Sequence, residues 1–229
     1  RGRLSRAAMT LPEVHLRQLI KPVRWGTFPR DFVVIQAGFA LYGLSIAMLI
    51  RARLGTSPWA VLEVALADLT GLSVGTRSIL VGLVVLAGAL ALREQVGWGT
   101  LANILSIGLW LDLSLAHLPD VTANLPAQAG LLLGGILTMG LASAIYIGVD
   151  AGAGPRDSLM LAVQRTTGLR LRVARGATEV VVVAVGWLLG GPLGAGTLVF
   201  ALLLGPSVQW AFRLFRLPTR APRQAGATD

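Results

Sequence analysis

Two short segments, 97 residues apart, carry the residue types best suited to hold a polar solute inside an apolar protein. The first reads Arg53-Leu-Gly55-Thr-Ser-Pro58-Trp59, and the second Asp150-Ala-Gly152-Ala-Gly154-Pro155-Arg156-Asp157-Ser158. In each, glycine permits the left-handed backbone that ends a helix, and proline suits the first turn of the next helix. If that next helix dips into a membrane, its unpaired amide groups point inward and can bind an anion or a polar group of a solute.

The side chains of these two elbows add to that interpretation. Arg156 would strengthen an anion site, and Trp59, at the matching position of the first elbow, would give an organic solute an aromatic wall. Asp157 could pair with Arg156, or with Arg53 or Arg170 elsewhere in the chain. Alternatively, both elbows are plain connections between helices, with Arg156 and Asp157 in headgroup water. The candidate substrate-binding residues are Pro58, Trp59, Gly152, Gly154, Pro155, Arg156, Asp157 and Ser158.

Two carboxylates are candidates for coupling transport to an ion gradient. Asp112 follows the uncharged run 95–111, and Glu179 lies one turn after Arg175 at the beginning of a predicted span. A carboxylate inside a membrane can carry a proton or a cation, although both residues could instead lie at the interface. The chain has no cysteine and only two isolated histidines, so we expect no metal site. It also has no Walker loop, Ser–His–Asp set, dinucleotide fingerprint or convincing cluster of acid, base and nucleophile, so we expect no cofactor and no enzymatic activity.

The two elbows belong to two copies of one unit. A shift of 97 residues, without a gap, places Gly43 on Gly140, Gly55 on Gly152 and Pro58 on Pro155. The same shift places the Gly-x-Gly-Thr-Leu sequence of 97–101 on that of 194–198. The matches fall on glycine and proline, where backbone geometry matters most. The sequence therefore predicts a pseudo-symmetric pair of repeats.

The composition is that of a membrane protein. Hydrophobic residues make up 54% of the chain and charged residues 14%, with a mean hydropathy of +0.70, whereas soluble domains carry about 25% charged residues. Apolar runs predict spans near 32–51, 76–93, 97–115, 128–149, 176–190 and 195–212. We expect an all-α polytopic membrane protein with about six transmembrane helices in two inverted three-span repeats, each with a short re-entrant or interfacial helix, at 58–70 and 155–167.

The basic residues predict the orientation. The net charge is +9, and six spans place all but three of the 20 Lys and Arg residues on the side of the N-terminus. The positive-inside rule then puts both termini in the cytoplasm, at the cell membrane, and explains the charge better than nucleic-acid binding does. If the short segments 58–70 and 155–167 also crossed, the chain would have eight spans in two parallel repeats, with four basic residues on the other side. Their length argues against crossing, because thirteen helical residues cover only about 20 Å of a roughly 30 Å hydrocarbon core.

Four regions follow from this topology. Residues 1–30 form a cytoplasmic N-terminal segment with an amphipathic helix, 31–120 the first membrane repeat, 121–216 the second, and 217–229 a disordered cytoplasmic tail. Membrane lipids are the expected surroundings, and this interpretation leaves room for a homo-oligomer.

A longer run of residues resembles a known family. The segment 140–160, with its Gly-Ala-Gly-Pro-Arg-Asp sequence, is similar to the YczE/YyaS/YitT-type family of bacterial membrane proteins, as are Thr167-Gly-Leu, Arg175, Glu179 and 186–206. The resemblance covers roughly 32–216 and implies a bacterial cytoplasmic-membrane protein without a settled activity. The YitT branch carries a soluble C-terminal domain that these residues lack, so the chain is expected nearer the YczE branch.

Two functions are compatible with these observations. The first is a permease or exporter of a small solute, which could be anionic, bound between the two elbows. The alternative is a non-transporting accessory or scaffold protein that binds a partner through its basic cytoplasmic loops.

Overall fold

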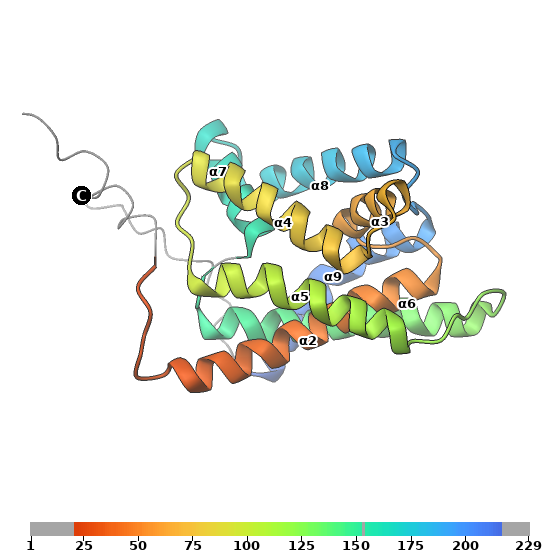
Figure 1. Ribbon diagram of the computed structural model, residues 1–229, viewed down its shortest axis with the longest axis horizontal. Helices are drawn as coiled ribbons and strands as arrows, with labels where there is room; N and C mark the ends of the chain where they lie inside the picture. Colours follow the sequence, from red (N-terminus) through yellow and green to blue (C-terminus); the bar gives the residue numbers. More distant parts are fainter. Residues whose placement is uncertain (1–20, 153, 217–229) are drawn as a thin grey trace, which may run out of the picture.

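The computed structural model describes residues 21–152 and 154–216, and these contain eight helices and no strand (Figure 1). The predicted tail and most of the predicted N-terminal amphipathic helix lie outside these ranges, and residues 21–27 are not helical. The helices are α2 (Phe28–Ala52), α3 (Pro58–Thr70), α4 (Val74–Ala91), α5 (Trp98–His117), α6 (Leu125–Val149), α7 (Pro155–Thr167), α8 (Leu171–Leu188) and α9 (Ala195–Leu214).

The helices of the second half reproduce those of the first. Each of α6 to α9 has the length of its counterpart among α2 to α5, and its bounds are shifted by the 97 residues of the sequence repeat. The two short helices, α3 and α7, span the residues predicted for them. The polytopic all-α fold expected from the sequence is therefore present.

The connections reproduce each other as well. Arg53 and Asp150 end α2 and α6 in the left-handed conformation, with φ of 54° and 56°. Gly71 and Gly168 end α3 and α7 in the same way, with φ of 69° and 70°. A left-handed residue at a helix C-terminus lets the chain turn while the last amide groups stay bonded. The matching turns give the two halves the same path.

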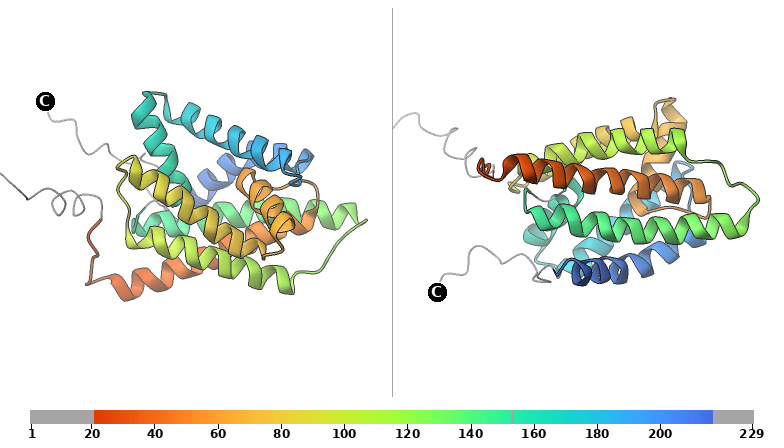
Figure 2. Two further views of the ribbon diagram at one scale, coloured as in Figure 1. Left: turned by 45° about the horizontal axis from the view of Figure 1, so that its top comes forward. Right: turned by 90° about the horizontal axis from the view of Figure 1, so that it is seen from below.

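The helices form two layers. The long helices α2, α5, α6 and α9 pack on one another, and α3, α4, α7 and α8 form a second group beside them (Figures 1 and 2). At the centre of the first layer α2 and α6 run antiparallel: Gly38 approaches Tyr146, while Gly135 approaches Leu49. Small residues allow this close approach, as is usual between helices in membranes.

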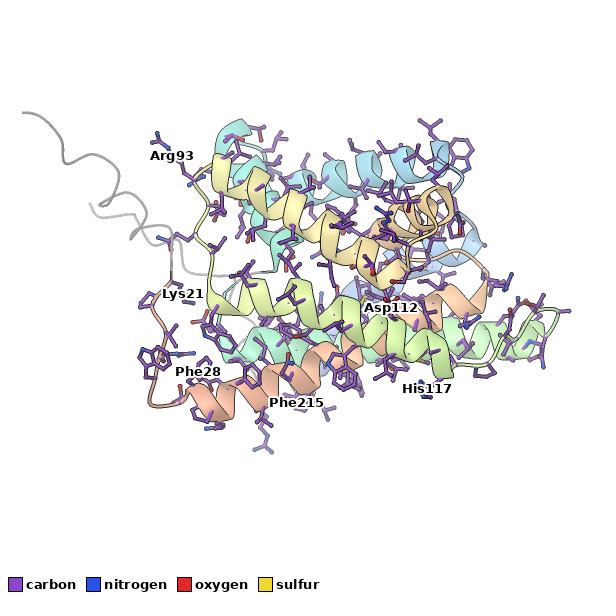
Figure 3. The ribbon with its side chains drawn as sticks, in the orientation of Figure 1. Lys21, Phe28, Arg93, Asp112, His117 and Phe215 are labelled. Carbon is purple, nitrogen blue, oxygen red and sulfur yellow. The ribbon has the colours of Figure 1, made fainter. Side chains whose placement is uncertain are left out.

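The two ends of the bundle differ in charge. At one end, here called the basic end, Lys21 Nζ contacts Asp150 Oδ1 at 2.7 Å and Arg24 donates to the Val149 carbonyl at 2.6 Å. Both cations thus sit at the C-terminus of α6, where the helix dipole favours them. Figure 3 shows Lys21 and Arg93 at this end and Asp112 and His117 toward the other, here called the far end.

Within the described ranges, five helices are long and apolar enough to cross a membrane: α2, α4, α5, α6 and α9. The sixth predicted span, 176–190, falls on α8, which begins earlier than predicted, at Leu171. The earlier start adds Arg172 and Arg175 to Glu179, which the predicted span already contained, and such charges are costly in hydrocarbon.

Candidate functional site

A cavity of about 150 Å³ lies between the two layers, and both elbows border it. All eight helices contribute to its wall. The first residues of α3 and α7, Pro58 and Pro155, both line it, so the N-termini of the two short helices open on the same space. Neither N-cap residue caps its helix with a side chain. The positive ends of two helix dipoles therefore face the cavity.

Arg156 connects the two halves of the chain at this cavity. Its guanidinium forms an ion pair with Glu63 of α3 and lies over the ring of Trp59, with Cζ 5.1 Å from the ring centroid. Glu63 is fully buried, whereas the Arg156 side chain keeps 23% of its surface exposed. A buried carboxylate is costly unless paired, so this ion pair ties α7 to α3.

Asp157, the next residue, has a different partner. Its Oδ2 accepts a hydrogen bond of 3.2 Å from the Tyr146 hydroxyl. The ring of Tyr146 in turn packs edge-on against Tyr42, with centroids 6.1 Å apart. Among the described side chains, Asp157 has no ion-pair partner within 4 Å. Its carboxylate and the two phenol rings thus form a polar and aromatic wall of the cavity.

Most of the predicted substrate-binding residues meet at this cavity. Six of the eight line it: Pro58, Trp59, Gly154, Pro155, Arg156 and Asp157. The other two do not. Gly152 has φ of +127° and approaches Gly97 so closely that a Cβ atom would lie 2.9 Å from the Gly97 backbone. Ser158 is fully buried, and its hydroxyl has no hydrogen-bond partner among the described residues.

The two predicted ion-coupling carboxylates lie in different places. Glu179 lines the cavity and accepts a hydrogen bond of 3.1 Å from Arg175 Nε, one turn earlier on α8. Asp112 lies away from the cavity, on α5 toward the far end. It accepts hydrogen bonds from Ser73 Oγ at 2.5 Å and from the Gly75 amide at 2.8 Å, and so holds the N-terminus of α4. Asp112 therefore stabilises the start of α4, and of the two candidate carboxylates Glu179 alone lines the cavity.

Three residues at or beside the cavity, Glu63, Tyr42 and Tyr146, were not predicted from the sequence. A signal for Glu63 was available, because it is a lone acid among apolar residues and therefore needs a buried partner. The tyrosines carried no comparable signal, since each lies in a long apolar helix. The predicted partners of Asp157, which were Arg53, Arg156 or Arg170, were replaced by Tyr146. Arg53 instead pairs with Asp120 at 2.6 Å.

The described part of the chain contains no cluster of three or more His, Asp or Glu residues that could hold a metal ion. The cavity is lined by guanidinium, carboxylate and hydroxyl groups together with aromatic rings. Small-molecule pockets commonly combine a few polar groups with an apolar and aromatic wall.

Comparisons with known proteins agree with this membrane architecture. The family described as "family of unknown function (DUF6198)" matches residues 29–213. An uncharacterised protein of Haemophilus influenzae is 32% identical over 85% of this chain and 89% of its own length. The "uncharacterized membrane protein YczE" of Bacillus subtilis is 33% identical over 74% of this chain and 79% of its own. The protein YyaS of the same organism is 27% identical over 73% and 85%. No solved structure matches significantly.

Proposed function

The chain belongs to the DUF6198 family and is similar to the YczE membrane protein, and on the geometry of its central cavity we propose that it is a permease or exporter of a small solute. The observation that carries the proposal is that one cavity is lined by matching positions of both halves. Pro58 and Pro155 are one such pair, and Trp59 and Arg156 are another. A site on a pseudo-two-fold axis, at the start of two interrupted helices, is typical of secondary transporters.

The direction of the helices supports inverted repeats. Counterparts α2 and α6 run antiparallel, so the two halves have opposite orientations relative to the bundle axis. In each half an extended elbow leads from the end of a long helix to the cavity, and the short helix α3 or α7 follows. This path is that of a re-entrant segment. Irregular backbone at membrane depth is tolerated where it lines a cavity.

The charges of the cavity guide the choice of solutes. Arg156 is neutralised by Glu63, and Arg175 by Glu179, whereas Asp157 accepts a hydrogen bond from the Tyr146 hydroxyl and forms no ion pair with the described residues. The positive charges are thus already paired, and the helix N-termini supply the remaining positive potential. A zwitterion, with a carboxylate near these N-termini and an ammonium group near Asp157, fits such a wall better than a simple anion. Zwitterions and organic cations therefore belong in the test beside anions.

Uptake and efflux of labelled zwitterions, cations and anions in proteoliposomes test the proposal. We expect flux of one class above that of protein-free liposomes. The double variant Glu63→Gln/Arg156→Gln, which keeps the charge balance, should lower it at least tenfold. The matched control is Arg53→Gln/Asp120→Asn, which removes an exposed ion pair away from the cavity. Absence of flux for all three classes with folded protein would contradict the proposal.

The contacts at the basic end favour a permease over an accessory protein. Lys21 and Arg24 bind the end of α6, and Arg165 binds the Arg93 carbonyl at 3.1 Å and Glu94 at 3.5 Å. These cations thus stabilise the chain's own helix ends. Co-purification of a stoichiometric partner protein, together with unchanged cellular activity of the cavity double variant, would instead support the accessory function.

A further inference from the structure

We propose that the structure is one of two alternating states, closed at the far end and open at the basic end, and that the other state arises when the two halves exchange their conformations. The inference rests on the proposed permease function. It is carried by a difference between the halves: α4 packs against α5, whereas the counterpart α8 makes no comparable contact with α9 among the described residues.

The contact between α4 and α5 closes the far end. Gly75 and Gly108 approach so closely that a Cβ atom on Gly75 would lie 2.1 Å from the Gly108 carbonyl oxygen. A Cβ atom on Gly108 would lie 2.5 Å from Ile79 Cγ1. Asp112 fastens this crossing by accepting hydrogen bonds from Ser73 and from the Gly75 amide. Backbone contact and a hydrogen-bonded carboxylate thus seal the layers together at this end.

The equivalent crossing in the second half is open. Gly205 is the counterpart of Gly108, and a Cβ atom placed on it would meet no atom within 4 Å. Gly176, the counterpart of Ile79, also has nothing within that distance. At the position of Asp112 stands Gln209, which could bond to the start of α8 as Asp112 does to the start of α4. The second half thus keeps small residues at Gly176 and Gly205 and a polar group at Gln209. Arg172 stands at the position of Gly75, so α8 cannot approach α9 there as closely as α4 approaches α5.

The cavity extends into this opening. Its wall includes Arg175 and Glu179 of α8 and Val208 of α9. The counterpart of Val208 is Leu111, which is fully buried and does not line the cavity. This position of the long helix thus borders the cavity in the second half and is sealed in the first, whereas Ser78 and Gly82, the counterparts of Arg175 and Glu179, line the cavity as well. Because α8 begins and α9 ends at the basic end, the passage leads there.

The layers supply the moving parts. The group α3, α4, α7 and α8 is held together by contacts among its own members, and α4 alone makes an extensive contact with the other layer among the described residues. The connections between the layers keep matching left-handed residues in both halves, Arg53 with Asp150 and Arg93 with Gly190. Rocking of one layer about the cavity would separate α4 from α5 and bring α8 onto α9. Interfaces of this kind switch between discrete packings.

A matched pair of glycine substitutions tests the proposal. Gly108→Ala places a methyl group inside the closed crossing and should favour the state open at the far end. Gly205→Ala adds the same group where there is space now, but would obstruct closure of α8 on α9, so it should favour the state described here. Overpacking of this size shifts a two-state equilibrium by about tenfold or more.

The readout is thiol labelling, for which the absence of cysteine provides a clean background. Leu111→Cys and Val208→Cys are each introduced alone and combined with either alanine. Rates with a membrane-impermeant maleimide are measured from each side of sealed vesicles, without added solute. We expect Val208→Cys to react from the basic end and Leu111→Cys from the far end. Gly108→Ala should speed the labelling of Leu111→Cys from the far end and slow that of Val208→Cys from the basic end. Gly205→Ala should have the reverse effects.

Two results would overturn the inference: no labelling of Leu111→Cys from the far end in any background, or equal effects of the two alanines. Size-exclusion profiles and thermal unfolding show whether Gly108→Ala folds. If it does not, Ser73→Ala, which removes one hydrogen bond to Asp112, replaces it with the same expected direction. Because labelling needs no solute, reciprocal labelling without flux would refute the permease and leave the two states standing. Solute flux without reciprocal labelling would refute the two states and leave the permease standing.

Discussion

Trp59 and Arg156 occupy the same position in the two halves of the chain, and they lie against each other, with the guanidinium carbon 5.1 Å from the centre of the indole ring. A residue that contacts its own counterpart must lie next to the pseudo-two-fold axis. The repeat, read only as a sequence shift, therefore brings an aromatic face and a cation together at the centre of the protein. The ion pair between Arg156 and Glu63 then fixes them there.

That ion pair gives a first prediction. Glu63→Gln or Arg156→Gln alone should destabilise the protein by about 3–5 kcal/mol, because each leaves a charge without its partner at a buried site. The double variant should lose less free energy of unfolding than the two single variants together, and the difference should correspond to a coupling energy of about 1–3 kcal/mol. Thermal unfolding in detergent measures all three. Simple addition of the two effects would show that the pair makes no favourable contact.

The half-exposed pair of Arg175 and Glu179 serves as the control for this cycle. The two residues are one helical turn apart on α8, at 3.1 Å. Exposed pairs at this spacing contribute only about 0.3–0.5 kcal/mol. Charge removal there should therefore change the unfolding temperature little.

A second prediction concerns the close approach of α2 and α5. A Cβ atom on Gly43 would lie 2.7 Å from the Trp110 Cβ and 2.8 Å from the Leu111 amide nitrogen. Gly43→Ala should therefore destabilise the protein by about 1–3 kcal/mol. Gly88, inside α4, has no atom within 4 Å of the same position, so Gly88→Ala should be neutral or stabilise by about 0.5–1 kcal/mol. Equal unfolding temperatures for the two variants would contradict this packing.

Much of the fold could be predicted because glycine and proline constrain the backbone locally. Pro58 and Pro155 mark the first residues of α3 and α7, and Gly71 and Gly168 their ends, so these bounds could be read directly. The start of α8 could not. Hydropathy alone placed it near residue 176, but helix formation depends on backbone hydrogen bonds and continues back to Leu171 through charged residues.

The site was harder to predict than the fold. Six elbow residues could be predicted for the site, because Pro58 and Pro155 fix where the short helices begin and both helices begin at the cavity. The partner of Arg156 lies 93 residues away in the other half, and nothing in the sequence alone determines how the halves face each other. Likewise, Asp112 lies in an apolar helix like a coupling residue, yet it binds the start of α4. Only the packing of the two layers shows whether such a carboxylate lines the cavity or binds the start of a neighbouring helix.

A third prediction concerns pH. Hydrogen bonds from the Thr122 hydroxyl and from Arg53 lower the pKa of Asp120, in the far-end loop, from 3.8 to about 2. A carboxyl group whose pKa is lower in the folded state stabilises that state when it is ionised, above about pH 4. This contribution should be lost as the pH falls from about 4 to 2. Asp120→Asn should remove that part of the acid dependence, measured as unfolding temperature against pH. An unchanged profile would contradict the assigned hydrogen bonds.

The last prediction uses two aspartates, seven residues apart, to separate the site from the surface. Asp157 lines the cavity and binds the Tyr146 hydroxyl, whereas Asp150 is exposed and paired with Lys21 at the basic end. If Asp157 recognises the solute, Asp157→Asn should lower flux at least tenfold, since a charge-assisted contact of about 1.5–3 kcal/mol is lost, while unfolding temperature stays close to that of the parent. Asp150→Asn should retain most of the flux. Equal flux in the two variants, both folded, would show that the Asp157 carboxylate does not contact the solute, and the zwitterion preference inferred from the cavity's charges would fail with it.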